Sequence, residues 1–135
     1  MPSAPTPKAA PGSPRTPLVT VIAALVGFEA LLLLAGAAYL VHGLVVEGSR
    51  APAAVISVVV LAVGFAAAIT FCARGLLALA AWSRSPLVVW QVLQVAAGLP
   101  AFNGGSPLLG LVLVLPAVAV GVGLFLPSVS AQVGR

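Results

Sequence analysis

The sequence predicts an all-α membrane protein in which four transmembrane helices form an antiparallel up-down bundle with both termini in the cytoplasm. The chain has 135 residues, of which 61% are hydrophobic and only 6% charged, whereas soluble domains carry about 25% charged residues. The charges leave long uncharged runs, at 51–73 and 85–134, and about 20 apolar residues suffice to span a bilayer. Polar and apolar residues do not alternate along these runs, so a transmembrane β-barrel is excluded.

The first sixteen residues differ from the rest of the chain. They are rich in proline and alanine and contain no large apolar residue after Met1. Such a segment cannot bury enough surface to offset the entropy lost on ordering. We therefore expect residues 1–16 to form a disordered cytoplasmic tail.

Prolines mark the expected start of each helix, because a proline in the first turn lacks only an N–H that would be unpaired there. In three of the four cases a serine or threonine precedes the proline and can cap the helix; the four dipeptides are Thr16-Pro17, Ala51-Pro52, Ser85-Pro86 and Ser106-Pro107. The predicted helices cover 17–46, 52–83, 86–102 and 107–126, within a transmembrane domain over 17–127.

Turn signals set the expected ends of the helices. The segment EGSRA at 47–51 follows the first helix, and Asn103-Gly104-Gly105 follows the third. Pro127 stops the fourth helix, and Pro116 is expected to kink it, because its ring crowds the preceding turn. Residues 128–135 are predicted to be a short cytoplasmic tail.

The basic residues set the expected orientation. Positively charged loops stay in the cytoplasm, and the side that holds both termini carries five of the six basic residues: Lys8, Arg15, Arg74, Arg84 and Arg135. This asymmetry predicts a multi-pass protein of the plasma (inner) membrane with cytoplasmic termini. Trp82 and Trp90 flank the inner connection, where we expect an aromatic belt.

The composition argues against several functional classes. Nucleic-acid binding requires clustered basic residues, and here they are scattered, so no nucleic-acid partner is expected. Cys72 and His42 are each the sole residue of their type, and the chain contains no aspartate. Catalytic, metal and cofactor sites therefore lack their usual components. The sequence predicts a non-enzymatic protein that binds no cofactor.

Two charges lie at membrane depth. Glu29 has apolar flanks on both sides, and Arg74 lies at a similar depth in the second predicted helix. Because a charge in hydrocarbon is costly, such residues pair with each other or mark functional sites. We expect Glu29 and Arg74 to form an ion pair whose hydrogen bonds are completed by Gln91 and Gln94. Alternatively, this polar network only fixes helix register, or Arg74 extends to the inner headgroups.

Two stretches carry a family resemblance: EALLLLAGAAYLVHGLV at 29–45 and ARGLLALAAWSRSPLVVWQVLQVAAG at 73–98. They resemble a group of small four-helix integral membrane proteins of actinobacteria, with an early intramembrane glutamate, a W-x-R-[ST]-P connection and a third helix that contains glutamine. The resemblance covers roughly residues 18–127. It implies a four-helix architecture and no particular activity.

A second resemblance concerns Glu29 alone. Small multidrug-resistance transporters are also short four-helix proteins with a glutamate in their first helix. Here the residues after Glu29, Ala30-Leu31-Leu32-Leu33, depart from that family's pattern because they include no small hydroxyl residue. The sequence therefore favours an accessory or assembly subunit of a membrane complex, whose partners are the lipid bilayer and another membrane protein or a second copy. The alternative is a proton-coupled small-molecule transporter that uses Glu29.

Overall fold

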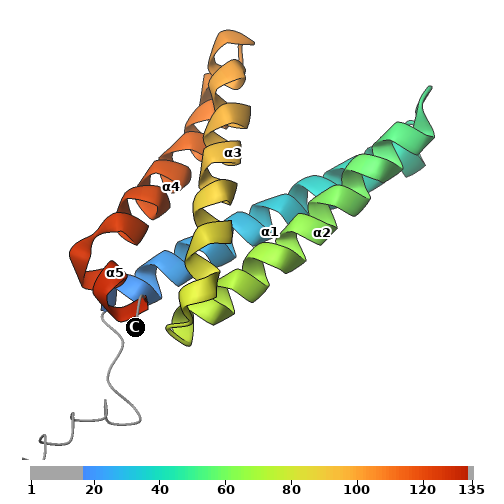
Figure 1. Ribbon diagram of the computed structural model, residues 1–135. Coiled ribbons are helices and arrows are strands. Elements are labelled where there is room, and N and C mark those ends of the chain that lie inside the picture. Colours follow the sequence, from blue (N-terminus) through green and yellow to red (C-terminus); the bar gives the residue numbers. More distant parts are fainter. Residues whose placement is uncertain (1–16, 134–135) are drawn as a thin grey trace, which may run out of the picture.

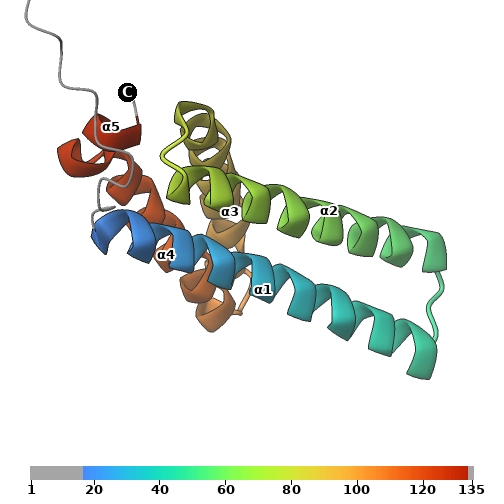
Figure 2. The same cartoon turned by 90° about the horizontal axis from the view of Figure 1, so that it is seen from below.

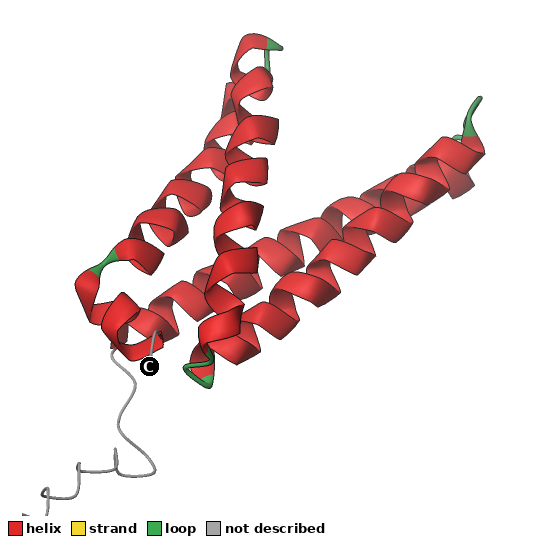
Figure 3. Ribbon diagram, in the orientation of Figure 1, coloured by secondary structure: helices red, strands yellow, loops and turns green. Residues whose placement is uncertain are grey.

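The computed structural model describes residues 17–133, which are helical almost throughout and include no strand (Figure 3). The elements are α1 (Pro17–Val46), α2 (Pro52–Leu77), the short 3-10 helix η1 (Ala81–Ser83), α3 (Arg84–Asn103), α4 (Pro107–Phe125) and α5 (Pro127–Val133). Four helical segments are long and apolar enough to cross a membrane: α1, α2, η1 together with α3, and α4. The structure thus supports a multi-pass membrane protein.

The four long helices form two hairpins. α1 packs against α2, and α3 packs against α4 (Figure 1). The hairpins meet at the end that contains α5 and then diverge like the arms of a V, as two perpendicular views show (Figure 2). Neighbouring helices are antiparallel, as predicted, but they do not form one compact bundle. In a membrane this arrangement is tolerated, because lipid covers apolar helix faces that water would force together.

Close helix contacts define the shared end of the two hairpins. A Cβ atom on Gly123 of α4 would lie 2.7 Å from Cδ1 of Ile22 on α1, so any larger residue here would force the Ile22 side chain to move. α5 folds back and buries Val129 and Val133 completely in the same core. Within the second hairpin, Gly98 of α3 similarly allows α4 to approach, since its Cβ would lie 2.7 Å from Cγ2 of Val114.

α2 ends at Leu77, six residues before the predicted end at Ser83. The N–H of Ala80 donates to the carbonyl of Gly75 and the N–H of Leu79 to that of Leu76, each at 2.9 Å. This is the Schellman pattern, in which the residue after the C-cap adopts a left-handed conformation. Leu79 does so with φ of 57°. Glycine usually occupies this position, and a leucine there leaves no signal of the turn in the sequence.

The helix starts agree with the prolines in most cases, but the predicted caps do not form. α1, α2 and α4 begin at the predicted prolines, whereas α3 begins at Arg84, before Pro86. Neither Ser83 nor Ser106 makes a side-chain capping bond, and Ser85 lies inside α3. Thr16 lies outside the described residues. The prolines, rather than the hydroxyl groups, thus account for the helix starts.

The predicted terminal segments fare differently. The predicted tail over 1–16 lies outside the described residues. The segment 128–135 was predicted to be a short tail, but its residues up to Val133 belong to α5. Pro127 therefore begins a helix as well as ending α4. Proline suits this position because it lies in a first helical turn. The described ends of the chain, Pro17 and Val133, lie at the same end of the molecule (Figure 1).

Candidate functional site

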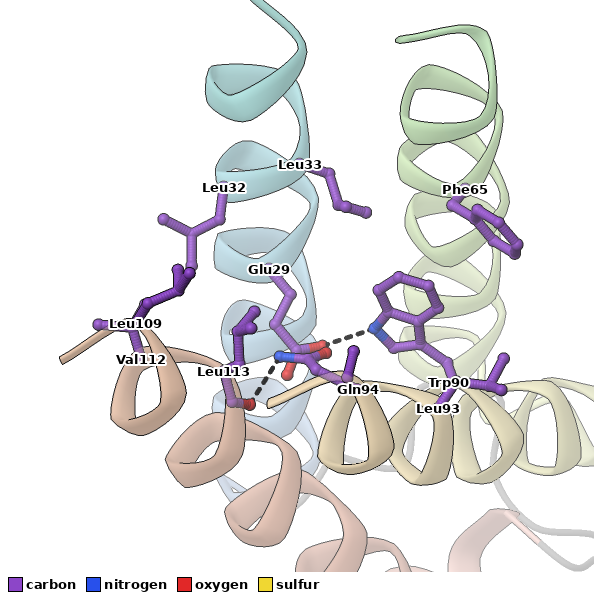
Figure 4. A pocket seen from close by; sticks show the side chains of 11 residues that line it. Glu29, Leu32, Leu33, Phe65, Trp90, Leu93, Gln94, Leu109, Val112 and Leu113 are labelled. Atoms are coloured by element: carbon purple, nitrogen blue, oxygen red, sulfur yellow. Dashed lines mark hydrogen bonds between the residues drawn. The ribbon is translucent and has the colours of Figure 1, made fainter. Parts of the chain in front are cut away.

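Glu29 is the centre of a buried polar cluster where α3 crosses α1. Its side chain is only 2% exposed, and Oε2 accepts two hydrogen bonds from α3 (Figure 4 shows the first). The Nε1–H of Trp90 donates at 3.2 Å and the Nε2–H of Gln91 donates at 3.1 Å. Both donors are uncharged, so dipoles rather than a cation stabilise the carboxyl group.

Gln94 extends the cluster to α4. It follows Gln91 by three residues and therefore lies on the same face of α3. Its Nε2–H donates to the backbone carbonyl of Leu113 at 3.0 Å (Figure 4). Leu113 lies in the turn before Pro116, next to Val112, whose carbonyl loses its helical partner because Pro116 has no N–H. In transmembrane helices a neighbouring helix can supply donors to carbonyls near a proline, and here Gln94 does so.

The structure does not bring Arg74 to Glu29. Arg74 is exposed and lies in the last turn of α2, and no ion pair forms within residues 17–133. The expected pair therefore requires correction. The physical reason is the early end of α2, which places Arg74 at a helix terminus, where a cation is favoured by the helix dipole and can reach the interface.

Three buried oxygen atoms in the cluster have no hydrogen-bond partner: Oε1 of Glu29, of Gln91 and of Gln94. Each is a side-chain oxygen, while the amide nitrogens of both glutamines already donate. Buried polar atoms are normally paired, because an unpaired one costs free energy. The cluster therefore has unused capacity to accept hydrogen bonds.

A cavity of about 550 Å³ adjoins this cluster where the hairpins begin to diverge. Glu29 and Gln94 are the polar side chains of its lining together with the indole of Trp90, and the other lining residues are apolar: Leu32, Leu33, Phe65, Leu93, Ala97, Leu109, Val112 and Leu113 (Figure 4). The volume lies within the range of about 300–1,000 Å³ that is typical of ligand pockets. The cavity thus combines an apolar wall with two residues, Glu29 and Gln94, whose buried Oε1 atoms are unpaired.

No protein-family model, curated protein or solved structure matches this chain. Its function must therefore be argued from the site. Glu29 has no second carboxyl group or histidine beside it to share acid–base chemistry, and residues 17–133 contain no group of three metal-binding side chains. The arrangement can hold a proton, or it can accept hydrogen bonds from a bound group.

Of the four predicted network residues, the structure brings together Glu29, Gln91 and Gln94 and leaves Arg74 outside. It adds Trp90, which sequence analysis assigned to an aromatic belt. The Trp90 indole turns inward, and its ring lies 5.3 Å from that of Phe65. The signal was its spacing: Trp90 precedes Gln94 by four residues and so lies on the polar face of α3.

Proposed function

We propose that this protein is a non-enzymatic accessory or assembly subunit that holds a helix of another membrane protein between its two hairpins. The observation that carries the proposal is the uncovered face of α1 beyond Glu29. Because the hairpins diverge, α3 and α4 cover this face only near their shared end (Figure 1). In the plasma membrane, with both termini cytoplasmic as the basic residues favour, the open side would face the outer leaflet.

Small residues make this face suitable for another helix. Gly36 and Gly43 follow Glu29 at intervals of seven residues, which places all three on one side of α1. A Cβ atom on either glycine would meet nothing within 4 Å, so neither glycine is needed for packing inside this chain. Glycines in transmembrane helices commonly permit close approach of a second helix.

Native purification with cross-linking tests this proposal. The protein is extracted in mild detergent after cross-linking in the membrane, and we expect a partner chain or a second copy to remain attached. Gly36→Leu should reduce the cross-linked fraction strongly, because the side chain fills the face. Gly27→Leu is the matched control: it lies on the opposite side of α1, and a Cβ there also meets nothing within 4 Å. A clean monomer before and after substitution contradicts the proposal.

A specific observation favours a second candidate, the proton-coupled transporter. A cation paired with Glu29 would hold the carboxyl group ionised and repel a cationic substrate. Within residues 17–133 no such cation lies beside Glu29, so its proton and a substrate remain able to compete for the same group. Proteoliposomes with an imposed proton gradient test this candidate, and a flux unaffected by Glu29→Gln removes it.

A further inference from the structure

The cavity beside Glu29 is lined by side chains that lack hydrogen-bond donors for some of their oxygen atoms. Two of its lining residues, Glu29 and Gln94, each have a buried Oε1 without a hydrogen-bond partner, and their side chains are 2% and 6% exposed. Both atoms are acceptors; the single N–H of Trp90 already donates to Oε2 of Glu29, and Nε2 of Gln94 donates to the carbonyl of Leu113. An occupant that satisfies this cavity must therefore bring donors, and one acceptor belongs to a carboxyl group.

The geometry points to a partner helix with a single lysine or arginine in mid-membrane, whose side chain enters the cavity and donates to Glu29 and Gln94. This inference rests on the proposed function and names the chemistry of the partner. A lysine ammonium offers three donors and an arginine guanidinium offers five. Either can bridge two oxygens, and a charge-assisted hydrogen bond to a carboxylate is stronger than a neutral one.

The shape of the site favours a helix over a free small molecule. The cavity wall includes Leu32 and Leu33 on one arm of the V and Leu109 and Val112 on the other. These four residues lie between the polar cluster of Glu29 and Gln94 and the open ends of the two hairpins. The cavity therefore continues toward the uncovered face with Gly36, where an apolar helix can lie while its basic side chain reaches inward.

The depth of Glu29 fixes where the basic residue must lie. Glu29 follows Pro17 by twelve residues, which corresponds to about 18 Å along α1, near the middle of a hydrocarbon layer of about 30 Å. A lysine or arginine in the middle of a lone transmembrane helix is unfavourable. Such a helix would gain stability by binding here, which agrees with a role in assembly.

Designed peptides test the inference with the full-length protein in lipid vesicles. The probes are three Leu–Ala transmembrane peptides of about 20 residues: one with lysine at its centre, one with leucine there, and one with the lysine moved by seven positions, or about 10 Å. Energy transfer between labelled peptide and protein gives the affinity. We expect the central-lysine peptide to bind at least tenfold more tightly than both others, equivalent to about 1.4 kcal/mol.

Two substitutions locate this preference. Glu29→Gln should abolish it, while Glu47→Gln, at the only other acidic residue of the chain, should preserve it. If Glu29→Gln protein fails to remain monodisperse, Gln94→Leu replaces it, and the preference should then fall several-fold. In each variant, tryptophan emission and the elution volume in detergent verify the fold.

Three outcomes would overturn the inference: equal binding of the lysine and leucine peptides, no binding of any peptide, or a lysine preference that survives in folded Glu29→Gln and Gln94→Leu proteins. Displacement of the lysine peptide by butylammonium at matched concentration would also overturn it, in favour of a small-molecule site. If the lysine and leucine peptides bind equally and Gly36→Leu abolishes the binding of both, only the requirement for a basic residue is refuted. The proposed function then stands. The absence of any cross-linked partner or second copy for the unsubstituted protein would refute the proposed function itself.

Discussion

Replacing Trp90 with phenylalanine isolates one hydrogen bond of the buried cluster. The substitution keeps an aromatic ring beside Phe65 but removes the N–H that donates to Oε2 of Glu29 at 3.2 Å. Hydrogen bonds to charged groups contribute about 1.5–3 kcal/mol in soluble proteins, and side-chain bonds between transmembrane helices reach about 1.7 kcal/mol. Because Oε1 of Glu29 is already unpaired, we expect Trp90→Phe to lower the free energy of unfolding by about 1.5 kcal/mol, near that upper value.

Reversible unfolding in mixed micelles, followed by circular dichroism, measures this loss. Trp82→Phe is the matched control, since Trp82 is 50% exposed and its stacking on Phe71 survives in phenylalanine. We expect the control to change stability by less than about 0.5 kcal/mol. A double-mutant cycle of Trp90→Phe with Glu29→Gln should show a coupling of about 1 kcal/mol, because the two residues contact each other.

The outcome that would refute this reasoning is specific. If Trp90→Phe costs no more than Trp82→Phe, the indole does not support Glu29. If the cycle with Glu29→Gln is additive, the loss comes from packing and not from the hydrogen bond. Either result would return Trp90 to the interfacial role that the sequence predicted.

Three further predictions concern the same helices. Arg74→Gln should change the free energy of unfolding by less than about 0.5 kcal/mol, because the side chain is exposed; a loss of several kcal/mol would restore the ion pair with α1. Gly98→Ala should cost about 1–3 kcal/mol through overpacking against α4, whereas Gly64→Ala, whose Cβ meets nothing within 4 Å, should not destabilise the protein. Gln94→Leu should cost about 0.6 kcal/mol, because it removes the donor on α3 that contacts the carbonyl of Leu113 on α4. An unchanged free energy of unfolding would contradict this role of the glutamine.

Much of the fold was predictable because prolines leave a strong local signal. Pro17, Pro52 and Pro107 begin helices in the structure as predicted, since proline is favoured in the first turn, where its missing N–H would be unpaired. The end of α2 was not predictable in this way. It depends on Leu79 in a left-handed conformation, which tertiary packing stabilises against an intrinsic cost of about 1–2 kcal/mol. Pro127 was ambiguous, because proline can end one helix and begin the next.

The site was predictable in its composition but not in its pairing. An intramembrane carboxyl group requires partners, and the face of α3 that carries Gln91 and Gln94 provides one of them. The predicted pairing with Arg74 rests on its depth in the membrane, which follows from a second helix that ends at Ser83. The end at Leu77 removes six residues of helix, or about 9 Å, from beneath Arg74. The wrong end of the second helix thus led to the wrong partner for Glu29.

The open shape of the molecule and the unpaired oxygen of Glu29 have a common origin. If the two hairpins were parallel, α3 and α4 would cover α1 along its length, and the cavity between them would close. The neutral donors of Trp90 and Gln91 contact only Oε2, so Oε1 stays buried without a hydrogen-bond partner in a residue that lines the cavity. A cation within the chain would have removed the need for an external donor. The absence of such a cation near Glu29 among residues 17–133 agrees with the proposed partner helix, whose basic residue would supply the external donor.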